Sequence, residues 1–302
     1  MDLIIILLIL LLTISMIILI SWVNSSNSSN IIGSSENTIE WENKNVYSSS
    51  DIIDIVEYIE KHIPKFNPIT NGELTQFKKS CSKNKNISLD QLISIRNMIA
   101  TQKSINAREN IYKKEREIKE SYNTDNKDLA KFFGKFSIPP LAIVKILDPK
   151  NLPSKIIEYA STHDSENPTV HKKILMNADK FELNLVNWIK NTYPTIKFKT
   201  QNELVQEQII KYGQPISTPD ILFEQPVLIR VTNNTKLTEH LIRWIDAKNY
   251  TLINIPFIMK SINKQCDKYL TNYGPGALAF HYGFSDDIKI PKILILDASF
   301  IK

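Results

Sequence analysis

Cysteine is scarce in this chain of 302 residues, which contains only Cys81 and Cys266. Two thiols cannot form a disulfide framework or a cysteine-based zinc site, so we expect both to be free in a reducing compartment. Strong charge of one sign is also missing: the net charge of +5 permits nucleic-acid binding without arguing strongly for it. With 42% hydrophobic and 23% charged residues, the composition is that of a globular protein that can bury a core.

Charged residues are absent from residues 3–23, which are almost wholly Leu, Ile, Val and Met. About 20 such residues can cross a bilayer as a helix. Because no basic residue precedes the run and no small-residue cleavage site is obvious, the pattern favours a membrane anchor over a cleaved signal peptide. The sequence therefore predicts a single-pass membrane protein that contacts the membrane through residues 3–23.

The orientation of this predicted anchor depends on weak signals. The first basic residue after the span is Lys44, so the positive-inside rule gives almost no information. Asn249 begins an acceptor sequon directly after Lys248, which belongs to the candidate site described below. A glycan at Asn249 would crowd that site, so we expect the soluble part to lie on the cytosolic side.

The rest of the chain divides into three predicted segments. Residues 24–50 are rich in Ser and Asn, which predicts a flexible linker. Residues 51–160 have helical periodicity, and residues 128–147 have the pattern of a helix-turn-helix, with Gly134 at the turn. Residues 170–302 alternate between strand and helix patterns, which predicts an α/β domain.

Within this α/β segment we expect two helices and five strands. The helices are predicted over 181–190 and 257–272, and Tyr273-Gly274-Pro275-Gly276 separates the second helix from the strand that follows it. The strands are predicted over 195–200, 221–231, 240–249, 277–284 and 293–300.

Two short motifs carry the chemistry. Thr218-Pro219-Asp220 precedes one predicted strand, and Asp246-Ala247-Lys248 lies in the next. Residues i and i+2 of a strand share a face, so Asp246 and Lys248 point the same way and Ala247 points to the packed side. If the two strands pair, the carboxylates of Asp220 and Asp246 converge with the lysine. A buried Asp–Lys pair is costly unless it has partners or a function, and this favours a functional site.

Such a group of residues suits phosphodiester hydrolysis. Mg²⁺ or Mn²⁺ can activate a water, neutralise the phosphate and support the leaving oxygen. Asp220 and Asp246 are the predicted metal carboxylates, and the carbonyl of Ala247 is a further candidate ligand. Lys248 can orient the attacking water or stabilise developing charge.

Taken together, the motifs resemble a known family. Thr218-Pro219-Asp220-Ile221-Leu222, Trp244-Ile245-Asp246-Ala247-Lys248 and Tyr273-Gly274-Pro275-Gly276, which leads to Tyr282-Gly283-Phe284, look like the TPD-motif family. That family includes the codanin-interacting nuclease of animals and belongs to the PD-(D/E)xK, restriction-endonuclease-like group. The resemblance implies a mixed sheet flanked by helices and a metal-dependent nuclease activity, here preceded by a helix-turn-helix-like region and an N-terminal transmembrane helix.

By position the resemblance implies that Asp220 and Asp246 bind metal and that Lys248 is catalytic. Asp246 stands where the family usually has Glu, and either carboxylate serves in the wider group. Glu182, on the helix before the first strand, is implied as a further metal-linked carboxylate. Gln265 and Tyr269 lie at i and i+4 on the helix after the lysine strand, and the resemblance implies that they face the site.

Other residues near these motifs rank lower. Glu203 and Glu207 flank the first predicted strand and are weaker alternatives to Glu182. His281 stands where the family tends to have an aromatic residue, and we interpret it as strand packing.

The leading hypothesis is a membrane-anchored, Mg²⁺- or Mn²⁺-dependent nuclease that acts on DNA, with RNA left open as an alternative substrate. Alternatives are a catalytically inactive nucleic-acid-binding or scaffold module on a membrane anchor, and a structural membrane protein that only docks partners. The sequence identifies no protein partner.

Overall fold

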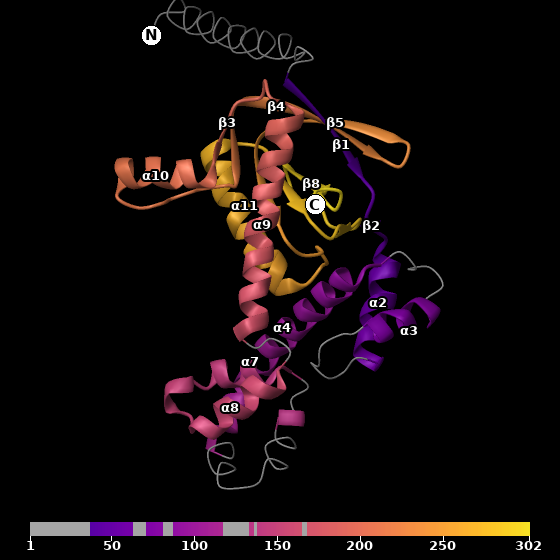
Figure 1. Cartoon of the computed structure of the whole chain (residues 1–302), viewed down its shortest axis with the longest axis vertical. Helices are drawn as coiled ribbons and strands as arrows, with labels where there is room; N and C mark the ends of the chain where they lie inside the picture. The colour runs from indigo at the N-terminus through magenta and orange to yellow at the C-terminus, as the bar shows by residue number, and fades with distance from the viewer. Residues whose placement is uncertain (1–36, 63–70, 81–86, 117–132, 136–137, 165–167) are drawn as a thin grey trace, which may run out of the picture.

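The computed structural model shows a twisted mixed sheet, which lies in the upper half of the view in Figure 1. The structure describes residues 37–62, 71–80, 87–116, 133–135, 138–164 and 168–302. Within them the strand order is β1-β4-β5-β6-β8, and β3 pairs with the other end of β4. The strands of this sheet are Thr38–Asn43 (β1), Phe198–Thr200 (β3), Ile221–Asn233 (β4), Lys236–Lys248 (β5), Gly276–Phe280 (β6) and Ile293–Asp297 (β8).

The long strands β4 and β5 form an antiparallel hairpin, as the convergence of the two motifs requires. Its register places Ile221 opposite Ile245. The next positions, Asp220 and Asp246, therefore lie side by side at the same end of the hairpin. β5 continues into parallel pairs with β6 and, through β6, with β8. The hairpin thus joins the two candidate motifs to the middle of the sheet.

Helices cover both faces of the sheet, which confirms the α/β class (Figure 1). α9 (Pro168–Thr192) shares a core with Ile245 and Ala247, whereas α11 (Pro256–Tyr273) shares a core with Trp244. Alternate residues of β5 thus contribute to opposite layers, as strand geometry requires. Of the predicted helices in this half, 181–190 lies in the C-terminal half of the longer α9, and 257–272 corresponds to α11.

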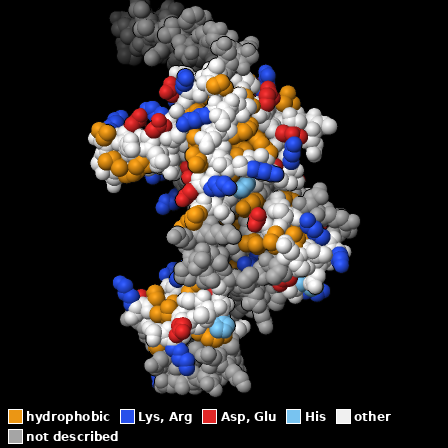
Figure 2. Space-filling view, in the orientation of Figure 1, with side chains coloured by type: hydrophobic (Ala, Val, Ile, Leu, Met, Phe, Trp, Pro, Cys, Tyr) orange, Lys and Arg blue, Asp and Glu red, His pale blue; other side chains and the backbone are white. Residues whose placement is uncertain are grey.

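One helix of this half was not predicted from the sequence. α10 (Gln201–Tyr212) follows β3 directly and projects from the sheet (Figure 1). Its hydrophobic periodicity is weak, because Leu204 and Gln208 are its buried residues and its apolar end is exposed (Figure 2). The sequence does contain a signal for the start of α10, because Thr200 and Glu203 have the spacing of a capping box and form one in the structure.

The first strand of the sheet lies within residues 24–50, where the sequence predicts a linker. β1 pairs in parallel with β4, and its residues Ile39 and Trp41 are buried. The alternation of these apolar residues with polar ones fits a strand with one buried face. The prediction of a flexible linker is therefore wrong for residues 38–43. A second short strand, β2 (Val46–Tyr47), pairs with β7 (Phe284–Ser285).

The helical region packs on the α11 side of the sheet and continues away from it (Figure 1). α2, α3 and α4 contribute Ile55, Phe77 and Leu92 to the core that also holds Trp244. Farther along, α4, α7 and α8 form a separate apolar cluster. These helices are Ser49–His62 (α2), Asn71–Ser80 (α3), Leu89–Lys113 (α4), Pro140–Ile146 (α7) and Ser154–His163 (α8), with a 3₁₀ turn at Pro149–Asn151 (η3).

Two sequence predictions fall partly or wholly outside the described residues. The second helix of the predicted helix-turn-helix is α7, but most of the first lies in the stretch 117–132, which is not described. The predicted membrane span at residues 3–23 is also outside them. Among the described helices, none combines the length and the apolar character needed to cross a bilayer.

Candidate active site

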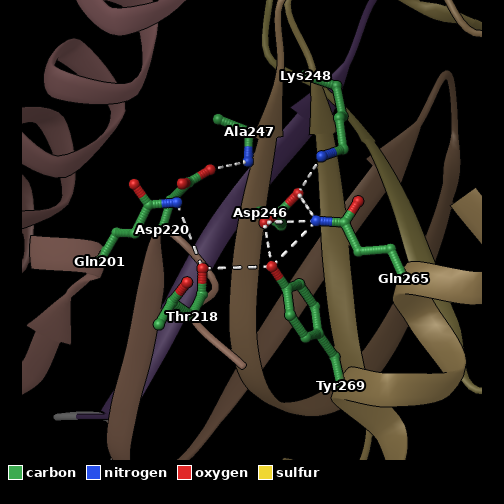
Figure 3. A network of polar contacts seen from close by, with 8 residues as sticks. All are labelled: Gln201, Thr218, Asp220, Asp246, Ala247, Lys248, Gln265 and Tyr269. Atoms are coloured by element: carbon green, nitrogen blue, oxygen red, sulfur yellow. Dashed lines mark hydrogen bonds and ion pairs between the residues drawn. The ribbon is translucent and has the colours of Figure 1, made fainter. Parts of the chain in front are cut away.

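The open end of the β4–β5 hairpin brings the two acidic motifs together (Figure 3). Asp220 stands just before β4, and Asp246, Ala247 and Lys248 end β5. Both carboxylates are buried, with 5% exposure for Asp220 and 2% for Asp246. The backbone N–H of Ala247 donates a 2.6 Å hydrogen bond to Oδ2 of Asp220. The strand carrying Asp246 thus holds Asp220 in place through its backbone.

Asp246 is the centre of a polar network that reaches α11 (Figure 3). Its carboxylate forms an ion pair with the ammonium group of Lys248. Oδ1 lies 3.2 Å from the hydroxyl of Tyr269, and Nε2 of Gln265 lies 3.4 Å from each carboxylate oxygen and donates to the Tyr269 hydroxyl at 3.0 Å. The structure therefore brings these four residues together, as the family resemblance implies.

Burial and like charge shape the acidity of Asp220. Burial raises the pKa of this carboxyl, and the negative charges of Asp246 and Glu182 raise it further, to about 8. The Ala247 N–H and the Lys248 ammonium act in the opposite direction but do not compensate. In the absence of a cation, burial and the neighbouring carboxylates therefore favour the protonated form of Asp220, since a second ionised carboxylate at this buried point is unfavourable.

Lys248, unlike Asp220, is favoured in its charged form. Burial by itself would lower the pKa of its ammonium group, but the adjacent Asp246 carboxylate more than compensates and raises it above the ordinary value. The side chain is only 17% exposed. Lys248 thus remains a fixed positive charge and hydrogen-bond donor next to Asp246.

Glu182 approaches the site from the opposite layer of the sheet. It lies on α9 and, with Asp220, lines a cavity of about 390 Å³. Burial raises the pKa of Glu182, and the charges of Asp179 and Asp246 add to the effect. In the part of the chain that the structure describes, no three His, Cys, Asp or Glu side chains are grouped to hold a metal ion. Glu182 therefore lies near the pair without completing a three-ligand centre.

The lower-ranked residues have other contacts. Glu203 caps α10 through Thr200, and Glu207 pairs with Lys199 at 2.6 Å. His281 stacks on Phe181 with ring centroids 4.3 Å apart. The packing interpretation of His281 thus agrees with its position.

Two residues to which the sequence assigned no role at the site, Gln208 and Tyr273, hold the loop before Asp220. The side-chain oxygen of Gln208 accepts from the N–H groups of Ile216 and Ser217 at 2.6 and 2.9 Å, and its Nε2 donates to the Ser217 carbonyl at 2.6 Å. The Tyr273 hydroxyl donates to the same carbonyl at 2.5 Å. Gln208 lies four residues after Leu204 on the buried face of α10, so a polar residue at an apolar position was the available signal.

The Thr218 carbonyl connects this loop to the catalytic candidates. It lies 3.2 Å from the Tyr269 hydroxyl and accepts from Nε2 of Gln201 at 3.4 Å (Figure 3). Tyr269 therefore contacts both the loop that carries Asp220 and the carboxylate of Asp246. The arrangement places two buried acids, one ammonium group and an amide–phenol pair within one connected network.

Comparison with known protein families agrees with the resemblance drawn from the Thr218-Pro219-Asp220 motif. A model of the family described as "Protein of unknown function TPD sequence-motif" matches residues 148–299, half of the chain. The chain belongs to the TPD-motif family. Its matched region contains the whole β4–β5 hairpin and α11, and hence the network around Asp246.

Similarity to a second protein extends beyond the region that the family model matches. The chain is 33% identical over 273 residues to "Uncharacterized protein L539" of Acanthamoeba polyphaga mimivirus. The aligned region covers 86% of this chain and 94% of that protein. No solved structure matches the chain.

Proposed function

We propose that this TPD-motif protein is a metal-dependent nuclease of the PD-(D/E)xK type that hydrolyses phosphodiester bonds in DNA. The observation that carries the proposal is the network at the end of the β4–β5 hairpin. There Asp220 is bonded to the backbone of Ala247, and Asp246 is paired with Lys248. The resemblance of the motifs to restriction-endonuclease-like enzymes adds support.

The donors present fit Mg²⁺ or Mn²⁺. Mg²⁺ is usually held by one or two carboxylates and keeps several waters, which leaves positions for substrate phosphates. Asp220 and Asp246 would supply the carboxylates, while the Ala247 carbonyl and Glu182 remain predicted additional ligands. When bound, the ion would activate a water and neutralise phosphate charge. The raised pKa of Asp220 supports the assignment, because a nearby cation would relieve the repulsion between buried acids.

The remaining side chains orient this centre. Lys248 presents an ammonium group that can direct the attacking water or stabilise charge that develops on the phosphate. Gln265 and Tyr269 fix the Asp246 carboxylate from α11.

Attachment to a membrane through residues 3–23, and a cytosolic position of the site, remain predictions from the sequence.

The direct test is cleavage of labelled DNA by the full chain. We expect cleavage with Mn²⁺ or Mg²⁺ and none after a chelator removes them, because the paired carboxylates alone do not activate water. Gel separation of the products measures the rate, and restoring the metal should restore it. DNA binding without cleavage at any metal concentration would favour the inactive binding module instead.

Metal binding is also expected to depend on pH. The folded protein holds the Asp220 proton more tightly than the unfolded chain, whose pKa is near 3.8, so this contribution stabilises the metal-free fold at low pH and is lost as the pH rises through about 8. A divalent ion should then raise the melting temperature more at about pH 8 than at about pH 6, where it must displace a proton.

Thermal unfolding of the full chain with and without Mg²⁺ measures this difference. Asp220→Asn should lose it, whereas Asp267→Asn, at an exposed acid of α11, should keep it. Equal metal-induced shifts at both pH values would contradict a role for Asp220 in binding the ion.

A further inference from the structure

α11 carries a row of three exposed lysines beside the site: Lys260, Lys264 and Lys268. They are spaced four residues apart, so they lie along one side of the helix at intervals of about 6 Å. Gln265 and Tyr269 stand one position after Lys264 and Lys268 and form the adjacent row, which contacts Asp246. The lysine row therefore runs along the edge of the candidate active site.

This row is not neutralised by neighbouring acids within the described part of the chain. Some basic residues elsewhere in the described part are paired: Lys199 lies 2.6 Å from Glu207, and Arg230 contacts Glu40 and Glu239. α11 itself has a single carboxylate, the exposed Asp267, and no ion pair is formed between it and the lysines. The row thus presents three positive charges that are available to an external anion.

A cavity of about 380 Å³ connects the row to the site. Lys264 and Lys268 line it together with the loop Pro215–Thr218. Gln265 and Tyr269 also line it, and both contact the carboxylate of Asp246. An anionic chain lying on the lysines would therefore pass directly over the groups that hold Asp246.

We propose that Lys260, Lys264 and Lys268 form a track for the phosphate backbone of the nucleic acid that enters the site. The proposal rests on the proposed nuclease function and names the surface that positions its substrate. Lysines contact phosphates as point charges and read no bases, so the track fixes position without selecting sequence. Each contact releases a condensed counterion, and binding through the track depends strongly on salt.

The test compares two triple variants of the full chain. One is Lys260→Gln, Lys264→Gln and Lys268→Gln. The control removes the same charge at exposed positions on α3, at the start of β5 and before β8: Lys79→Gln, Lys236→Gln and Lys289→Gln. Binding of a labelled DNA duplex is measured with a chelator present, so that no cleavage occurs, between about 50 and 200 mM salt.

We expect the α11 triple variant to bind about tenfold more weakly at the lowest salt, and its slope of log affinity against log salt to fall by about 2 to 3. The control should remain close to the wild type. With metal present and DNA saturating, the α11 variant should keep the wild-type turnover, because it leaves Asp246 and Lys248 intact. Its KM for DNA should be raised, because the DNA binds more weakly.

Three results would overturn the track. They are an unchanged slope, an equal loss in both triple variants, or row-dependent binding to phosphatidylserine vesicles in place of DNA. Each leaves metal-dependent cleavage by the wild type as a separate measurement. Wild-type protein that binds DNA through the row but never cleaves it would refute the nuclease function while supporting the track.

Discussion

Asp246→Asn is expected to lower metal-dependent DNA cleavage by about 10³-fold or more. The amide keeps the shape of the side chain but removes the charge that pairs with Lys248 and that would bind the cation. Lys248→Met is expected to have a comparable effect, because it leaves the buried Asp246 carboxylate without its ammonium partner. Initial cleavage rates with Mn²⁺, measured on labelled DNA, compare these variants with the wild type.

Asp267→Asn is the matched control for Asp246→Asn, since Asp267 is an exposed acid on α11. It should cleave at the wild-type rate. DNA binding in chelator should survive in Asp246→Asn, which separates lost chemistry from lost binding. Cleavage at the wild-type level by both Asp246→Asn and Lys248→Met would refute the roles assigned to this pair.

Gly276→Ala is expected to destabilise the protein by about 3 kcal/mol, the upper part of the range for overpacked cores. A methyl group at Gly276 would lie 2.0 Å from Cε2 of Trp244, whose ring is fully buried and donates from Nε1 to the Gly274 carbonyl at 2.9 Å. A contact this short forces either the buried Trp244 ring or the backbone of Gly276 to shift. The ring also packs against Tyr269 with centroids 5.0 Å apart, so its displacement should disturb the site and reduce activity.

Urea unfolding followed by circular dichroism measures the free energy of unfolding that Gly276→Ala is expected to lower. Gly134→Ala is the matched control: nothing lies within 4 Å of the added methyl group, so this variant should not lower the free energy of unfolding. If Gly276→Ala unfolds at the same urea concentration as the wild type, the close contact with Trp244 does not constrain the fold.

The candidate site was readable in sequence because its spacings are local. Asp246 and Lys248 share a face by strand alternation, and Gln265 and Tyr269 share one by helix periodicity. Gln208 and Tyr273 could not be assigned in this way. Their function in the structure is to bond to the Ser217 backbone, a partner that no local period indicates.

The helices of the second half show a similar division. α9 and α11 have apolar stripes that face the two cores, and both were predicted. α10 has only two buried residues, so hydrophobic patterning did not indicate it, although its capping box is a local signal.

By itself the sequence determined the α/β class, the hairpin strands and the residues of the acidic motifs, because periods of two and of 3.6 residues are set by backbone geometry. Only the tertiary structure decided that β1 joins β4 as a parallel neighbour, since that pairing connects residues about 190 positions apart. It also decided that burial raises the pKa of Asp220 and that the α11 lysines border the cavity. Burial and charge proximity depend on which elements pack together, and the pattern of one segment does not contain that information.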